Sequence, residues 1–116
     1  MTYKIGFSVA EKKFIEGDFS DANTFTFQFI NNTDKDIEGV KGVISFNDLF
    51  GDQIKRVNIS YDEGIKAGET KLYRASLDYN QFMDEDMKLR QTELEKLKYE
   101  WEVQTIIYAD GNQENY

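Results

Sequence analysis

The 116-residue sequence contains no cysteine, no histidine and no proline. Without Cys or His, the chain cannot form disulfides, use a thiolate nucleophile, carry out imidazole acid–base chemistry or build a Cys/His zinc site. The lack of cysteine does not identify a compartment, because exported and cytosolic proteins can both lack it. Without proline, every turn has to rely on Gly, Asn and Asp.

Long apolar runs and basic clusters are also missing. No stretch reaches the roughly 18 apolar residues of a membrane span, and the first ten residues lack the apolar centre of a signal peptide. The formal net charge is −8, and the densest basic run is the pair Lys12-Lys13. We therefore expect neither direct membrane insertion nor a nucleic-acid partner. Met1 either begins a cytoplasmic protein or opens a chain whose export signal was removed.

Aromatic residues are what the chain has in quantity, with nine Phe and seven Tyr. Such large, flat side chains suit the interior of a β-sheet, and a disordered chain would lack them. The length fits one domain over residues 1–116, which can remove roughly two-thirds of its unfolded surface from water.

Apolar and polar residues alternate in several segments that are separated by turn sequences, which predicts antiparallel strands. The predicted strands run through residues 3–9, 24–30, 37–46, 54–61, 72–77 and 99–107. Residues 11–21 are charged and predict a connection whose Phe14, Ile15 and Phe19 fold back onto the core. Turns are expected at residues 31–34, 48–52 and 62–70, with Gly51 at a positive φ.

Three departures from simple alternation carry further predictions. Gly42 within a strand indicates a bulge or a close backbone approach. The apolar pattern slips by one residue between Ile54 and Val57, which predicts a second bulge. A change to helical spacing predicts a helix within residues 81–97, with acidic residues 84–86 in its first turn. The residues that show this spacing are Met83, Met87, Arg90, Leu94, Leu97 and Trp101.

These patterns predict an all-β fold, an antiparallel Ig-like β-sandwich of six to eight strands with one short helix before the last strand. The uncharged run 25–29 should lie inside a sheet, and the charged run 53–61 should lie at an edge. Tyr61, Tyr73 and Tyr108 are candidates to face outward, and either Ile107 or Tyr108 must do so. The expected core is Phe27, Ile44, Phe46, Ile59, Leu77, Trp101 and Val103.

Acidic residues are the remaining candidates for chemistry. They cluster at Asp34/Asp36, at Asp48/Asp52 and at 84–86, but without the spacing of a calcium loop, and turn formation and helix capping explain them. Among 22 acidic residues some pair will lie at a hydrolytic separation by chance. No phosphate-binding glycine loop is present. We expect no catalytic, cofactor or metal residues and no enzyme activity.

The middle of the chain resembles the bacterial Ig-like lipoprotein domains of the FxLYD family and its DUF4352-like relatives. The matching elements are the turn 31–33, the strand 40–46, the turn 48–51 and the pair Gly68-Glu69. Residues 47–50 read Asn-Asp-Leu-Phe where the family has Leu-Tyr-Asp, and the helical stretch 81–97 lies outside its pattern. The resemblance implies an extracytoplasmic interaction or spacer module without established catalytic residues.

The expected function is a non-catalytic binding or structural module, in the cell envelope or secreted if an export signal was removed and cytoplasmic otherwise. A protein partner would add a strand at a sheet edge. Two alternatives stay open, a small carboxylate-based carbohydrate-active enzyme and a cytoplasmic or phage-borne accessory protein.

Overall fold

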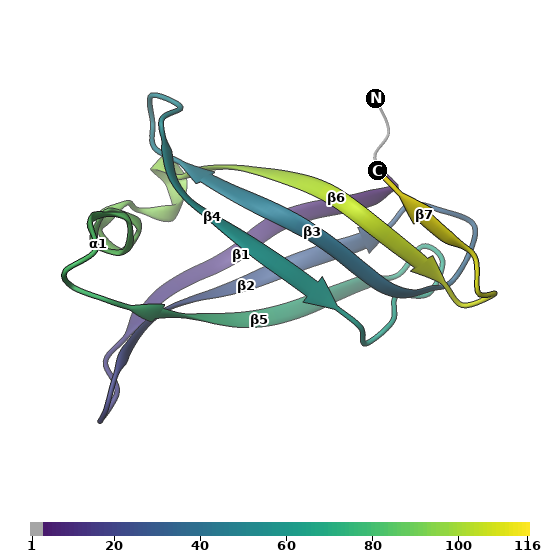
Figure 1. Cartoon of the computed structure of the whole chain (residues 1–116), viewed down its shortest axis with the longest axis horizontal. Coiled ribbons are helices and arrows are strands. Elements are labelled where there is room, and N and C mark those ends of the chain that lie inside the picture. Colours follow the sequence, from purple (N-terminus) through teal and green to yellow (C-terminus); the bar gives the residue numbers. More distant parts are fainter. Residues whose placement is uncertain (1–3) are drawn as a thin grey trace.

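The computed structural model describes residues 4–116, which form two antiparallel β-sheets packed face to face (Figure 1). The strand orders are β1-β2-β5 in one sheet and β4-β3-β6-β7 in the other. A helix, α1 (Asp84–Gln91), and a 3₁₀ turn (Leu94–Lys96) connect β5 to β6. The strands are β1 (Ile5–Ile15), β2 (Asp21–Asn31), β3 (Ile37–Asn47), β4 (Gln53–Tyr61), β5 (Thr70–Tyr79), β6 (Lys98–Tyr108) and β7 (Gln113–Asn115).

This strand order is that of an immunoglobulin-like sandwich, as predicted. In the nomenclature of that fold, β1, β2 and β5 occupy the places of strands A, B and E. The opposing β4, β3, β6 and β7 occupy those of C′, C, F and G. The helix precedes β6 and therefore not the last strand, because β7 follows. With three residues, β7 is too short to show an alternating pattern in the sequence.

The core is built on β2, which pairs with β1 on one side and with β5 on the other. Its Phe25, Phe27 and Phe29 are buried, so the uncharged run lies inside a sheet as predicted, and β4 lies at an edge. Of the predicted core, four residues are buried (Phe27, Ile44, Phe46, Ile59) and three are partly buried against them (Leu77, Trp101, Val103).

The first strand is longer than predicted. Residues 11–15 continue β1 after a register shift between Val9 and Glu11, because β2 begins early enough to pair with them. Phe19 is fully exposed at the hairpin tip and Ile15 is half-exposed, so neither returns to the core. Phe14 instead packs against Tyr79. Tyr3, predicted to begin this strand, lies outside the described residues.

Register shifts lie at or beside both positions where the sequence pattern departs from alternation. The register of β3 against β6 shifts between Lys41 and Gly42, and that of β3 against β4 shifts so that Ile54 has no partner. Gly51 has a φ of 89° in the turn that joins β3 to β4.

The helix is shorter than the predicted span and buries a different face. Leu89 and Asp86 are buried, whereas Met83 and Arg90 are exposed. The helix has only eight residues, and its buried Leu89 determines which side packs against the sheets. The longer apolar stripe predicted over residues 83–101 therefore does not form one packed helix face. Lys55 of β4 forms a salt bridge with Asp86 and holds the helix to the sheet. No helix within residues 4–116 is long and apolar enough to cross a membrane.

Two of the tyrosines predicted to face outward are buried. The Tyr61 hydroxyl donates to the Gly64 carbonyl oxygen at 3.1 Å, and the Tyr108 hydroxyl donates to Glu114 at 2.6 Å. These partners satisfy the hydroxyl groups and allow the rings to be buried. Ile107, with 39% exposure, is the member of its pair that faces outward.

Candidate functional site

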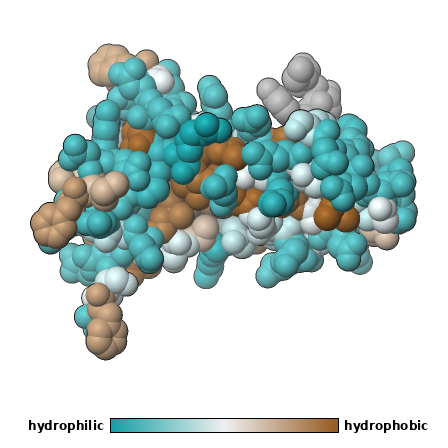
Figure 2. Space-filling view, in the orientation of Figure 1, coloured by the Kyte–Doolittle hydropathy of each residue, from teal (hydrophilic) through white to brown (hydrophobic). Residues whose placement is uncertain are grey.

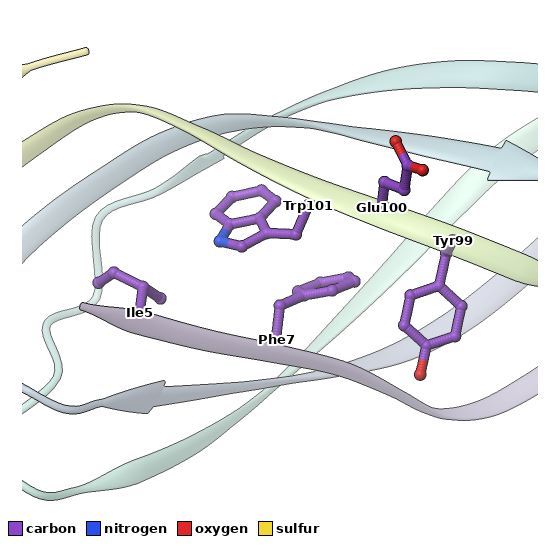
Figure 3. Close-up of a pocket in the computed structure, with 5 residues that line it drawn as sticks. All are labelled: Ile5, Phe7, Tyr99, Glu100 and Trp101. Carbon is purple, nitrogen blue, oxygen red and sulfur yellow. The ribbon is translucent and has the colours of Figure 1, made fainter. Parts of the chain in front are cut away.

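A hollow of about 400 Å³ opens along the flank of the sandwich where β1 faces β6 (Figure 3). It is lined by residues from only these two strands, one in each sheet. On the opposite flank, where β4 faces β5, the rings of Tyr61 and Tyr73 meet edge to face at 5.6 Å. We call the open hollow the aromatic groove; its lining residues are Ile5, Phe7, Tyr99, Glu100 and Trp101.

Phe7 lies at the centre of the aromatic groove. Its ring stacks on Trp101 with 5.1 Å between ring centroids and meets Tyr99 edge to face at 5.8 Å. It also contacts Phe27 and Phe29, so the floor of the groove is continuous with the core. Period-2 alternation places these rings on the inner face of their strands, and the gap between the sheets leaves Phe7, Tyr99 and Trp101 partly exposed.

One wall of the aromatic groove is the outer edge of β1, whose single neighbour among the described strands is β2. The Lys4 carbonyl accepts from the Asn32 N–H at 2.9 Å. Because antiparallel pairing alternates, Ile5, Phe7 and Val9 point their N–H and C=O groups away from β2. The Val9 N–H accordingly reaches the Tyr99 hydroxyl at 3.2 Å. The segment 5–9 contains no charged residue, so its edge main chain is unprotected.

The other wall is the free part of β6. Strand β7 pairs with β6 only from Thr105 to Ile107, and the Tyr116 N–H donates to the Gln104 carbonyl just beyond. Residues 98–103 therefore have β3 as their only neighbouring strand in the described chain. Two open edges thus border the same aromatic surface.

The indole nitrogen of Trp101 is buried and has no hydrogen-bond partner in the described structure. Figure 3 shows this nitrogen on the side of the ring that faces Ile5. A buried donor without an acceptor is uncommon in folded proteins and is unfavourable.

The aromatic groove is lined mainly by apolar and aromatic side chains. Among the described residues that line it, Tyr99 and Glu100 are titratable, and Figure 3 shows the Glu100 carboxylate pointing away from the hollow. Glu100 is the single carboxylate among the described lining residues, whereas a glycoside hydrolase pairs two carboxylates.

The acidic clusters singled out in the sequence lie in turns and in the helix. Asp48 accepts the N–H groups of Phe50 and Asp52, and the hydrogen bond from Lys88 lowers the pKa of its carboxyl below the usual range. Asp36 accepts the N–H of Ala67, which ties two loops together. Within residues 4–116 no three acidic side chains gather into a metal-ligating group.

Comparison with known proteins identifies the fold and nothing finer. No family model and no curated protein matches the sequence. The chain is similar to a solved structure described as the X-ray structure of Northeast Structural Genomics Consortium target SoR45. That match has a TM-score of 0.50 at 14% identity and covers 97% of this chain and 80% of that chain. At this identity the likeness supports the all-β sandwich alone.

Proposed function

We propose that this domain is a non-catalytic binding module that accepts an extended peptide segment of a partner protein along the aromatic groove. The observation that carries the proposal is the position of the uncharged edge of β1 directly beside partly exposed aromatic rings. An extended peptide would pair with the outward N–H and C=O groups of Ile5 and Phe7. Its alternate side chains would then lie over Phe7 and Trp101.

The edge of β1 is better suited to this role than the other long edges. Strand β4, the edge expected from the sequence to take a partner, carries Lys55 and Arg56, and β5 carries Lys71 and Arg74. Charged side chains on an edge discourage pairing with another strand. The proposal therefore moves the partner site from β4 to the first half of β1.

The compartment and the family are part of the proposal and rest on the resemblance described above. As a member of the FxLYD-like lipoprotein domains, the module would act outside the cytoplasm of a bacterium. The start of the gene tests this directly, because an export signal before Met1 would support it and a native start at Met1 would contradict it.

A selection from a random peptide library displayed on phage tests the binding site. Two matched variants decide the location: Ser8→Lys places a charge on the solvent face of β1, and Ser60→Lys places one on β4. Peptides that bind the groove should have alternating apolar residues and should lose at least about tenfold in affinity with Ser8→Lys but not with Ser60→Lys.

Hydrogen exchange provides the second readout. The bound peptide should slow exchange of the Ile5 and Phe7 amides, whose N–H groups point away from β2. Peptides that protect β4 instead, or whose affinity is the same in both variants, would place the site elsewhere and overturn the assignment to β1.

A further inference from the structure

Three phenylalanine side chains protrude from one end of the sandwich, on a different surface from the aromatic groove. Phe19 lies at the tip of the β1–β2 hairpin, Phe50 in the β3–β4 turn and Phe82 in the β5–α1 connection. Phe19 is fully exposed, and the other two are 87% and 85% exposed. In Figure 1 all three connections lie at the left end of the molecule, with the β3–β4 turn at the top, the β5–α1 connection in the middle and the β1–β2 hairpin at the bottom, and Figure 2 shows apolar groups standing out from a hydrophilic surface at that end.

The β5–α1 connection and α1 lie between the other two connections, and contacts hold the three in place. The Lys88–Asp48 salt bridge of 2.9 Å joins α1 to the β3–β4 turn. Asn80 accepts the Phe82 N–H at 3.0 Å, and Asp48 accepts that of Phe50 at 3.0 Å. One hollow of about 380 Å³ separates the β1–β2 and β5–α1 connections, and another of about 440 Å³ separates the β3–β4 turn from α1 and the residues after it. We call this surface the loop end.

Folding does not explain the three rings. They add nothing to the core, because almost all of each side chain is in water. Exposed aromatic residues grouped on one surface are typical of a binding site, and loops at one end of an Ig-like sandwich are where such sites are often built.

The charge beside each ring indicates the chemistry of the partner. Asp18 precedes Phe19, Asp52 lies two residues after Phe50, and Asp84 lies two residues after Phe82. None of the three aspartates forms a salt bridge within residues 4–116. Together with the net charge of −8, they would repel an anionic membrane or a nucleic acid and attract a basic surface.

The size of the loop end fits a protein partner. The molecule measures 34 and 21 Å along its two shorter axes, and a standard protein interface, which takes roughly 800 Å² from each partner, is wide enough to span the three connections. Aromatic residues in such interfaces act as anchors that fill pockets on the partner.

We propose that the loop end docks onto a basic surface of a partner protein, with Phe19, Phe50 and Phe82 as apolar anchors. The flanking aspartates meet Lys or Arg side chains of that partner. This surface is separate from the peptide site on β1, so a partner could occupy both at once.

The same phage-displayed random peptide library tests the loop end with a different set of variants. Phe19→Ser, Phe50→Ser and Phe82→Ser are combined in one variant, and Leu72→Ser with Ile107→Ser is the matched control, because both are exposed apolar residues on strands. A third variant combines Asp18→Asn, Asp52→Asn and Asp84→Asn. All three should melt as the wild type does, because they change exposed side chains.

A class of selected peptides should contain Lys or Arg together with large apolar residues. Their affinity for the triple Ser variant should be at least about tenfold lower than for the wild type. It should also fall with the triple Asn variant and in high salt. The control variant and Ser8→Lys should bind these peptides as the wild type does. The proposal would be overturned if no selected peptide depended on the three Phe residues, or if the dependent peptides were not basic. Binding of the wild type to phosphatidylcholine vesicles through these residues would also overturn it, as would self-association through them.

Discussion

At the scale of single residues, Gly42 of β3 marks a close approach between the two central strands of the larger sheet. A Cβ atom on Gly42 would overlap the ring of Trp101 and would lie 2.6 Å from the Glu102 carbonyl oxygen. Gly39, in the same strand, has room, since the nearest atom to its Cβ would be the Tyr61 carbonyl oxygen at 3.5 Å. Two glycines in one strand thus have opposite steric environments.

We predict that Gly42→Ala lowers the free energy of unfolding by about 2–3 kcal/mol, whereas Gly39→Ala changes it by less than about 1 kcal/mol. Urea unfolding of both variants measures the difference. In a Trp101→Ala background, the cost of Gly42→Ala should fall only in part, because the main chain of Glu102 remains in the way. Equal effects at the two glycines would show that β3 and β6 do not approach as described.

Individual aromatic residues also show where sequence reasoning succeeds and where it fails. Phe27 was predicted correctly to be buried, because alternation alone decides which face of a strand is apolar. Tyr61 and Tyr108 were predicted wrongly, because their burial depends on hydroxyl partners in later segments. The aromatic groove escaped prediction for a related reason: the exposure of Phe7 and Trp101 follows from the order of the strands, and no local pattern encodes that order.

At the scale of elements, β7 is held by a carboxylate at its centre. Glu114 accepts hydrogen bonds from the Tyr108 hydroxyl at 2.6 Å and the Tyr116 hydroxyl at 2.7 Å, and it pairs with Lys4 at the start of β1. With only three paired residues, β7 depends on these contacts more than the longer strands do.

The hydrogen bond from Lys4, followed by those from Tyr108 and Tyr116, lowers the pKa of Glu114 to about 2. A carboxyl with a lowered pKa in the folded state stabilises the fold fully above its ordinary pKa of about 4.5, and this contribution is lost as the pH falls through about 2. We predict that Glu114→Gln loses less stability than the wild type when the pH falls from about 4.5 to about 2. An NMR titration of the Glu114 carboxyl should have its midpoint near pH 2.

Melting curves at several pH values provide the comparison. The wild type should be more stable than Glu114→Gln at neutral pH, and the two curves should converge as the pH approaches 2. Glu102→Gln, a matched change at a largely exposed glutamate, shows whether loss of any carboxylate has the same effect. A Glu114 midpoint near 4.5 would mean that β7 is not held by this carboxylate.

Strand and helix boundaries were predictable where one face is apolar and the other polar. The second half of β1 contains Glu11, Lys12 and Lys13, which look like a loop in the sequence. It is a strand because β2 extends alongside it, a condition that only the pairing partner supplies. The helix lies inside the span 81–97 where the apolar spacing changes to three or four residues, as predicted. Its packed face depends on Leu89 and on the ion pair of Asp86 with Lys55, which the spacing does not reveal.

At the scale of the whole molecule, the two sheets are joined by ring contacts between β2 and the opposite sheet. Phe25 stacks on Phe46 with 4.9 Å between ring centroids, and Phe29 contacts both Tyr61 and Trp101. Because β2 also has a strand on each side, opening its central residues requires both sheets to separate. The edge of β1 needs no such opening.

This difference predicts a pattern of amide hydrogen exchange that separates the core from the flank. The amides of residues 25–29 should be the slowest in the chain, because they exchange only through global unfolding. In β1 the rates should alternate: Gly6 and Ser8 face β2 and should be slow, whereas Ile5 and Phe7 face the open flank and should be fast. Exchange measured by NMR at two protein concentrations checks the pattern. Protection of Ile5 and Phe7 that rises with concentration would mean that β1 pairs between copies, and uniform rates along β1 would contradict the open edge.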